Sequence, residues 1–516
     1  MSQIEVKNLT FSYEGSGDNI FEQVSFSIDT AWKLGFLGRN GKGKTTFLRL
    51  LMGEEEYLGT IQGGTVFDYF PYRVTKEQLS CSGAELAEMW KADCESWRVL
   101  RELEKLNVEA EVLYRPFGTL SFGERTKVML AVLFSGENDF LLVDEPTNHL
   151  DQTSRETVKK YLAGKKGFLL ASHDRDLLDA CVDHVLVLNR QSIEVQNGNF
   201  STWWENKRRK DAFSQAENEK HRKEIQKLKG AAARSRQWAD KSERSKIGFD
   251  PIKEPDHKGK RPFIGAKTKK MQSRVKQMEQ RLHREIEEKE GLLKDIEEVA
   301  DLKLTPLIHH KDCLLRVEDY GLKYEGASDW VFEGLTFTLH QSERVFLTGK
   351  NGCGKSSLVR AILASASGDR ESILQTEKLS EKGILETAAG LRISCVSQDT
   401  SWLKGSIKEF CRVRDLDEPL FCAILRQLDL ERTQFIKPME TYSEGQKKKI
   451  LLAASLLTPA HLYLWDEPLN YIDVFSRMQI ENLISTFCPT MLLVEHDVRF
   501  RKTVGTGEYE IARTFF

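Results

Sequence analysis

The sequence of 516 residues has little of what marks disulfide-rich, secreted or membrane-spanning proteins. Its nine cysteines are scattered and no two form a C-x-x-C pair, which argues against a disulfide framework or a zinc site. No apolar run approaches the roughly 20 residues that a transmembrane helix needs. The start, MSQIEVKNLTFSYEG, has no basic stretch followed by an apolar one, so we expect no signal peptide and a cytoplasmic location.

The sequence does contain a long internal repeat. GRNGKGKTT at 38–46 recurs as GKNGCGKSS at 349–357, and LLVDEPTNHLD at 141–151 recurs as LYLWDEPLNYID at 462–473. The spacings agree, since Lys44 and Lys355 are 311 residues apart and His173 and His496 are 323 apart. We therefore predict a duplicated α/β domain, at 1–204 and 306–516.

The segment between the copies, 205–305, has a different composition. Residues 207–284 hold 25 Lys and Arg against 10 Asp and Glu, although the whole chain has a net charge of only −2. Residues 205–246 contain no proline and predict one long helix, prolines and glycines interrupt 247–262, and helical periodicity resumes at Phe263. This pattern predicts a basic helical hairpin with its tip at about 240–265.

Each copy contains a P-loop between an apolar strand and a helix, the context that this motif requires. Glycines let backbone N–H groups surround phosphates, while a lysine and a hydroxyl serve the phosphates and Mg²⁺. The predicted ATP-binding residues are Gly38, Asn40, Gly41, Gly43, Lys44, Thr45 and Thr46, and Gly349, Asn351, Gly352, Gly354, Lys355, Ser356 and Ser357.

Acidic pairs follow two apolar strands. Asp144 and Asp466 are expected to hold Mg²⁺ together with Thr45 and Ser356, and the next residues, Glu145 and Glu467, to polarise the attacking water. His173 and His496 follow further strands, where a histidine can hydrogen-bond a γ-phosphate. Ser-x-Gly sequences open predicted helices upstream of both acidic pairs, at Ser121 with Gly123 and at Ser443 with Gly445, another arrangement suited to anions.

These motifs resemble those of the ABC ATPase superfamily. The resemblance implies that two domains close head-to-tail, so that each Ser-x-Gly signature, including Gln446, caps the ATP on the opposite P-loop. It also implies that Tyr13 and Tyr324 stack on adenine. The family's glutamine after the sheet strand is present as Gln398, a further Mg²⁺ ligand, but Tyr72 stands in its place in the first half.

The arrangement of the whole chain resembles the ABC-F family, and the long hairpin is similar to that of the Lsa/Vga-type antibiotic-resistance branch. This resemblance implies a monomer that enters the ribosomal exit site and places its hairpin beside the P-site tRNA and the 23S-type rRNA. Such proteins dislodge lincosamides, pleuromutilins and streptogramin A drugs. Basic and aromatic residues suit a polyanion and unpaired bases, and the predicted tip contacts are Trp238, Lys246, Ile247, Phe249 and Phe263.

Three alternatives remain open at this point. The chain could be the ATPase subunit of a membrane exporter, although that role predicts a neutral linker. It could be a general ABC-F translation factor without a role in drug resistance. A DNA-associated ABC ATPase would carry its coiled coil inside one ATPase domain, whereas this hairpin lies between two complete domains, so we expect no DNA partner. The basic charge of the hairpin argues against a membrane subunit.

Overall fold

The computed structural model separates the chain into two compact units, one made of Met1–Trp203 with Ala300–Phe516 and the other of Trp204–Val299. The residues that it describes are 3–13, 19–38, 43–92, 94–136, 140–148, 150–188, 193–244, 273, 276–277, 281, 304–324, 326, 329–367, 379–428, 430 and 432–511. None of the helices in these ranges combines the length and apolar character that crossing a membrane requires.

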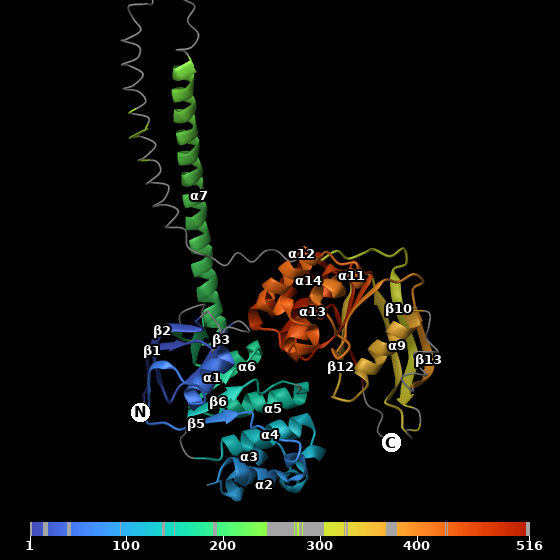
Figure 1. Cartoon of the computed structure of the whole chain (residues 1–516). Coiled ribbons are helices and arrows are strands. Elements are labelled where there is room, and N and C mark those ends of the chain that lie inside the picture. Colours follow the sequence, from blue (N-terminus) through green and yellow to red (C-terminus); the bar gives the residue numbers. More distant parts are fainter. Residues whose placement is uncertain are drawn as a thin grey trace, which may run out of the picture. The chain divides into compact units, whose positions relative to one another are not determined.

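The first domain is built on a parallel sheet in the order β5-β6-β7-β3-β8, with β9 added antiparallel at one edge (Figure 1). A separate antiparallel sheet has the order β2-β1-β4. The elements of this domain are β1 (Gln3–Phe11), β2 (Phe21–Asp29), β3 (Lys33–Gly38), α1 (Lys44–Met52), β4 (Leu58–Gln62), β5 (Phe67–Phe70), η1 (Gln78–Ser80), α2 (Gly83–Trp90), α3 (Ser96–Lys105), η2 (Ala110–Tyr114), η3 (Phe117–Thr119), α4 (Phe122–Leu133), β6 (Phe140–Asp144), α5 (Gln152–Ala163), β7 (Phe168–Ala171), α6 (Arg175–Cys181), β8 (His184–Leu188) and β9 (Ile193–Asn197).

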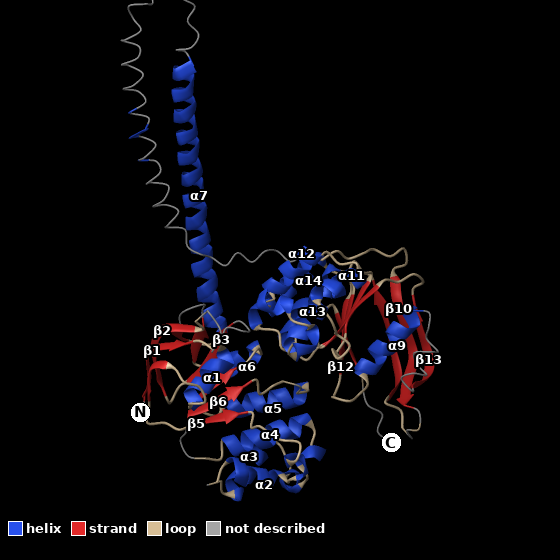
Figure 2. Ribbon diagram, viewed as in Figure 1, coloured by secondary structure: helices blue, strands red, loops and turns tan. Residues whose placement is uncertain are grey.

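The second domain repeats this plan with a parallel sheet β14-β15-β16-β12-β17 and an antiparallel sheet β11-β10-β13 (Figure 2). Its elements are β10 (Cys313–Tyr324), β11 (Phe332–His340), β12 (Arg344–Thr348), α9 (Lys355–Ser367), β13 (Leu379–Thr387), β14 (Ile393–Val396), α11 (Ile407–Val413), α12 (Glu418–Gln427), η5 (Arg432–Ile436), η6 (Met439–Thr441), α13 (Glu444–Leu457), β15 (Leu462–Asp466), α14 (Val474–Phe487), β16 (Met491–Val494), α15 (Val498–Val504) and β17 (Gly507–Glu510).

The predicted central strands are buried on both faces, as their uninterrupted apolar sequences require. Every residue of β15 and the first four of β6 are buried. The apolar side chains of these strands pack with those of β3, β7, β12 and β16 into the cores of the two domains. Because parallel strands end at the same edge of a sheet, the residues that follow β3, β6 and β7 are brought together there.

Between the domains runs one long helix, α7 (Phe200–Arg244), which confirms the helix predicted for 205–246. Its first turn is held by Phe200 and Trp203, which are buried. The helix begins five residues earlier than predicted because these aromatic residues pack while the following sequence supplies good helix formers. The side chain of Trp238, the remaining predicted tip residues Lys246, Ile247, Phe249 and Phe263, and almost all of the second predicted hairpin helix lie outside the described residues.

Candidate ATP sites

Both P-loops connect a central strand to a helix, as the sequence predicts. In the first, the Lys44 Nζ atom donates a 2.8 Å hydrogen bond to the carbonyl oxygen of Gly38. In the second, Lys355 Nζ donates to the carbonyl oxygens of Gly349 and Lys350, at 2.9 and 3.0 Å. The two amines are therefore positioned by carbonyl groups of their own loops, close to the helix N-termini that favour an anion. The predicted ligands Asn40 and Gly41 lie outside the described residues, whereas Asn351 and Gly352 form the turn of the second loop.

Two of the predicted glycines leave no space for a side chain. Gly43 has a φ of +97°, and a Cβ atom there would lie 2.5 Å from Cγ2 of Ile20. Gly354 has a φ of +96°, and a Cβ atom would lie 2.7 Å from Cγ1 of Val331. The left-handed backbone and the close approach of these side chains explain why each loop carries glycine just before its lysine.

The two tyrosines predicted to stack on adenine are attached to the P-loop helices in the same way. The hydroxyl of Tyr13 lies 2.9 Å from Oγ1 of Thr46, and that of Tyr324 lies 2.9 Å from Oγ of Ser357. Their side chains remain 40% and 41% exposed. An anchored hydroxyl with an exposed ring leaves an aromatic face available for a base.

The acidic pairs stand at the ends of β6 and β15. Glu145 and Glu467 both have left-handed backbones, with φ of 49° and 47°. Their N–H groups donate to the neighbouring strands, to Ala171 at 2.8 Å and to Val494 at 2.9 Å. Left-handed conformations are rare for residues other than glycine and are found at functional sites, where surrounding structure holds them. Burial, together with the adjacent Asp144 charge, raises the pKa of Glu145 to about 7.

Each glutamate faces the histidine that the sequence pairs with it. His173 Nε2 lies 3.5 Å from Glu145 Oε1, and His496 Nε2 lies 3.8 Å from Glu467 Oε1. Burial lowers the pKa of His173 well below its ordinary value, and burial and the Lys355 charge lower that of His496 to about 3. Both rings are therefore neutral at physiological pH. Among the described groups, Nε2 of His496 is buried without a hydrogen-bond partner.

Gln398, predicted as a Mg²⁺ ligand, contacts two groups of the second site. The Ser356 hydroxyl donates to Gln398 Oε1 at 3.5 Å, and Gln398 Nε2 donates to Glu467 Oε2 at 3.3 Å. A hydrogen bond to the same serine lowers the pKa of Asp466, although burial, the larger effect, raises it. Hydroxyl, amide and carboxylate oxygens thus converge in the manner that Mg²⁺ prefers.

In the first site Tyr72, at the position of the missing glutamine, is directed to a different partner. Its hydroxyl donates to Asp68 Oδ2 at 2.8 Å, and its ring stacks on Trp90 with centroids 4.7 Å apart. Lys91 pairs with the same Asp68 oxygen at 3.2 Å. Instead, Tyr69 on β5 reaches the acidic pair, donating its hydroxyl to Asp144 Oδ2 at 3.0 Å.

The signature serines cap the helices that they were predicted to open. Ser121 precedes α4 and forms a capping box with Glu124, and Ser443 precedes α13 and forms one with Gln446. The Gln446 side chain accepts the Ser443 N–H at 3.0 Å, so its role in the described structure is to cap the helix. Gly123 and Gly445 lie in the first turns of these helices, where the backbone N–H groups are unpaired within the helix.

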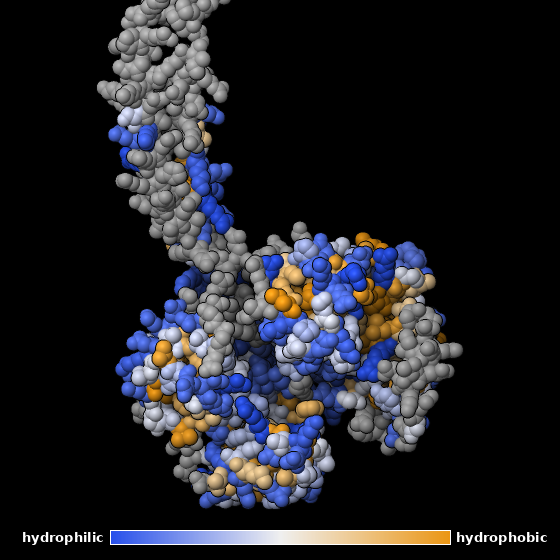
Figure 3. Space-filling model, in the orientation of Figure 1, coloured by the Kyte–Doolittle hydropathy of each residue, from blue (hydrophilic) through white to orange (hydrophobic). Residues whose placement is uncertain are grey.

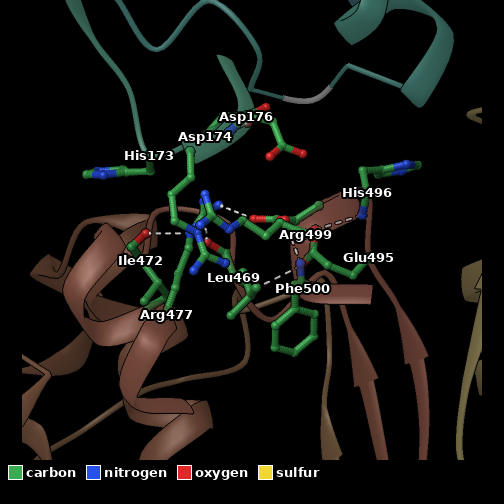
Figure 4. A network of polar contacts seen from close by, with 12 residues as sticks. His173, Asp174, Asp176, Leu469, Ile472, Arg477, Glu495, His496, Arg499 and Phe500 are labelled. Atoms are coloured by element: carbon green, nitrogen blue, oxygen red, sulfur yellow. Dashed lines mark hydrogen bonds and ion pairs between the residues drawn. The ribbon is translucent and has the colours of Figure 1, made fainter. Parts of the chain in front are cut away.

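Residues of the second domain contribute charge to the first site. The pKa of Lys44 is lowered by burial and, to a smaller extent, by Lys449, whereas Glu145 and Asp473 raise it. Arg477 lowers the pKa of His173, after burial and Lys44. Figure 4 shows the Arg477 guanidinium, which donates to the carbonyl oxygens of Ile472 and Leu469, both at 2.9 Å, and to a carboxylate oxygen of Asp497 at 3.2 Å.

Residues of the first domain face the second site in turn. A cavity of about 590 Å³ is lined by Asp151 and Gln152 at the start of α5 and by Gly349 and His496 of the second domain. The Arg501 guanidinium, at the same cavity, donates to Gln152 at 2.9 Å. Each P-loop region is thus approached by groups from the other half of the chain.

Sequence reasoning missed several residues of these sites, notably Tyr69, Asn470 and Arg477. Asn470 donates to Glu467 Oε2 at 2.7 Å. Its counterpart Asn148 stands three residues after Glu145 in the first repeat, so the recurrence of asparagine in LVDEPTN and LWDEPLN was an available signal. Arg477 has the counterpart Arg155, but an arginine inside a helix carries no such motif.

Comparison with known proteins places these features in a family. The family model described as ABC transporter matches residues 21–148 and again 332–470. The chain is 26% identical over 519 residues to the ribosome protection protein VmlR of Bacillus subtilis (strain 168), covering 98% of this chain and 87% of the relative. It is 24% identical over 532 residues to the energy-dependent translational throttle protein EttA of Haemophilus influenzae, covering 95% and 88%.

Solved structures share the fold at lower identity. The archaeal ribosome recycling factor aABCE1, in complex with the ribosomal stalk protein aP1, superposes with a TM-score of 0.60 at 17% identity over 98% of this chain and 87% of that one. A structure named RNase-L Inhibitor superposes with a TM-score of 0.57 at 16% identity, with the same coverage. The two matched segments, the repeated acidic pairs and the long helix between them show that the chain belongs to the ABC family of ATPases, as a tandem ATP hydrolase of the ABC-F type.

Proposed function

We propose that this ATPase acts on the ribosome and displaces antibiotics from the peptidyl transferase centre, namely lincosamides, pleuromutilins and streptogramin A. The observation that carries the proposal is the basic segment between two complete ATPase domains. Most of its described part is the 45-residue helix α7, on which Arg209 and Lys223, each paired with a glutamate four residues earlier, have side chains 80% and 74% exposed. Figure 3 colours the described part of this helix mainly as hydrophilic. Exposed cations on a long helix favour contact with nucleic acid phosphates.

The two ATP sites act through domain closure in this proposal. Site one would use Lys44, Thr45, Asp144, Glu145 and His173, and site two Lys355, Ser356, Asp466, Glu467 and His496. The signature serines Ser443 and Ser121 would cap the γ-phosphates bound to the opposite P-loops. ATP can drive closure only through its higher affinity for the closed state.

Mg²⁺, bound through the serine or threonine hydroxyls and aspartate carboxylates, would neutralise charge on the phosphates. Around it the chain's own groups set the geometry. Glu145 and Glu467 accept a proton from the attacking water, and the neutral histidines donate a hydrogen bond to the γ-phosphate. Hydrolysis then removes the γ-phosphate, which connects each P-loop to the opposite signature serine, and the domains separate.

The ribosomal role is tested by trapping the ATP-bound form. The double variant Glu145→Gln with Glu467→Gln is expected to co-sediment with ribosomes when ATP is present and not when ATP is absent. The matched control, Lys44→Ala with Lys355→Ala, removes the phosphate-binding amines and is expected to stay in the supernatant in both conditions. Failure of the trapped form to co-sediment in ATP would exclude the proposed cycle.

The drug role is tested separately, in a susceptible host that expresses the chain. Wild type is expected to raise the inhibitory concentration of at least one of the three drug classes. Phe249→Ala at the predicted tip is expected to abolish this protection while ATP turnover stays unchanged. Phe213→Ala, which removes an exposed aromatic residue of α7 away from the predicted tip, serves as the control.

A general translation factor of the same type is the second candidate. It is favoured by the similarity to EttA, whose name describes a translational throttle and no drug. Under this alternative the trapped form still binds ribosomes, but expression leaves drug susceptibility unchanged. The two assays together therefore distinguish the candidates.

A further inference from the structure

The first ATP site lacks the glutamine that organises the second, and a side chain from the neighbouring strand bonds its aspartate instead. Strand β5 pairs with β6 so that Tyr69 lies opposite Leu142, and β14 pairs with β15 so that Cys395 lies opposite Leu464. Since Leu142 and Leu464 each precede the strand-end aspartate by two residues, Tyr69 and Cys395 occupy equivalent positions. The sequence therefore places a long hydroxyl-bearing side chain in one sheet where the other has a short thiol.

That difference in length decides what each side chain reaches. The Tyr69 hydroxyl donates to Asp144 Oδ2 at 3.0 Å, and the residue packs against the apolar core of the first domain. Within the described residues the Cys395 thiol makes no hydrogen bond, and Gln398 links Ser356 to Glu467 rather than to the aspartate.

Tyr72 does not take this role, because three groups hold it in another place. Asp68 accepts its hydroxyl, Lys91 fixes Asp68, and Trp90 stacks on its ring. Moving Tyr72 toward Asp144 would break the hydrogen bond and the stacking together, without a new partner for Asp68.

We propose that Tyr69 is a positioning residue of site one, which fixes the Asp144 carboxylate in the orientation that receives magnesium. One carboxylate oxygen is held by the tyrosine hydroxyl, and the other remains for the metal. Site one would thus orient its metal-binding aspartate directly, whereas site two connects its hydroxyl and its glutamate through an amide. This inference concerns ATP binding alone and does not depend on the ribosomal role.

The test measures the magnesium dependence of nucleotide binding rather than turnover. In a Lys355→Ala background, which weakens the second site, binding of a fluorescent trinitrophenyl-ATP is followed while MgCl₂ is titrated. Tyr69→Phe keeps the ring and removes only the hydroxyl, and it is expected to raise the midpoint magnesium concentration about tenfold to a hundredfold, the effect of one hydrogen bond to a charged group. Tyr72→Phe is the matched control and is expected to leave the midpoint unchanged.

A second variant guards against a folding defect. Tyr69→Cys installs the side chain that the second domain carries at the equivalent position, and it is expected to raise the midpoint at least as much as Tyr69→Phe. Thermal unfolding in the absence of magnesium verifies that each variant is folded. Unchanged midpoints in both Tyr69 variants, or an equal shift in Tyr72→Phe, would overturn the proposal.

Discussion

The two ATP sites of this chain descend from one repeat, yet different side chains organise their acidic groups. In the second domain, Gln398 connects Ser356 with Glu467. In the first, Tyr69 holds Asp144, and Tyr72 belongs to a separate cluster with Asp68 and Trp90. The comparison shows that a missing motif residue does not by itself mean a lost site, because a neighbouring strand position can supply a hydrogen bond to another member of the acidic pair.

The largest expected effect comes from the glutamates. If both sites hydrolyse, Glu145→Gln and Glu467→Gln each remove the turnover of one site, and the double variant loses at least about a hundredfold of the ATPase rate, because a general base contributes that much. Steady-state phosphate release from the two single variants measures the share of each site. A single variant as inactive as the double one would show that only one site turns over or that the sites fire together.

The next largest effect concerns a pair of equivalent arginines. Arg477 and Asp497 have side chains 7% and 6% exposed, whereas Arg155 and Asp174 are 13% and 18% exposed and 3.8 Å apart. Breaking the more buried pair leaves an uncompensated charge, so Arg477→Ala should lower the free energy of unfolding by about 3–5 kcal/mol. Arg155→Ala should cost about 1 kcal/mol. Urea unfolding compares the two, and equal losses would contradict the stated difference in burial.

Acid should reduce the stabilisation that the buried pair of Arg477 and Asp497 provides. Burial on its own would raise the pKa of Asp497, but the Arg477 charge and the Phe500 N–H outweigh it and place this pKa below its ordinary value. The stabilisation is therefore present at neutral pH and is lost as the pH falls through the pKa of the folded state. The difference in unfolding free energy between wild type and Arg477→Ala should therefore shrink as the pH is lowered from about 5 to about 2, across and below the unfolded carboxyl pKa of about 3.9. A difference that stays constant over this range would rule out the ionised pair as its source.

The smallest expected effect comes from the helix caps. Ser121→Ala and Ser443→Ala each remove the side chain that accepts a backbone N–H, of Glu124 and of Gln446, and should cost about 1 kcal/mol of stability each. If the serines also cap ATP on the opposite P-loop, both variants should weaken ATP-induced closure, measured as a change in protection from proteolysis. Glycine substitutions remove the same hydroxyls at a cost of only a few tenths of a kcal/mol, so they test closure at nearly unchanged stability. Loss of stability without loss of closure would restrict these serines to a structural role.

Much of this architecture could be predicted from the sequence because its signals are local. Short motifs of a few residues identify the P-loop, the buried strand that ends in Asp-Glu and the helix that begins at a serine. Each motif occurs twice because the domain is repeated. The predicted helix at 205–246 was confirmed by α7 for the same reason, because its composition and lack of proline are local properties.

The remaining features depend on strand register and on distant neighbours. By its position in the sequence, Tyr72 replaces the expected glutamine. The pairing of β5 with β6 instead places Tyr69 within hydrogen-bond distance of Asp144. Tyr72 is held away from the site by Asp68 and Trp90. Arg477 and Asp473 approach the first P-loop from the second domain, some 430 residues away from Lys44 in sequence. A sequence motif does not show which residues of one domain lie near the P-loop of the other.

The length of α7 also has a mechanical consequence. A helix of 45 residues extends for about 68 Å, so a tilt of about 5° at its base carries its far end through about 6 Å. The base is fixed in the core by Phe200 and Trp203, and the Trp203 ring touches Phe475 of the second domain, with centroids 5.9 Å apart. A small rotation of the helix base would therefore move the far end of the helix by about the width of an aromatic ring.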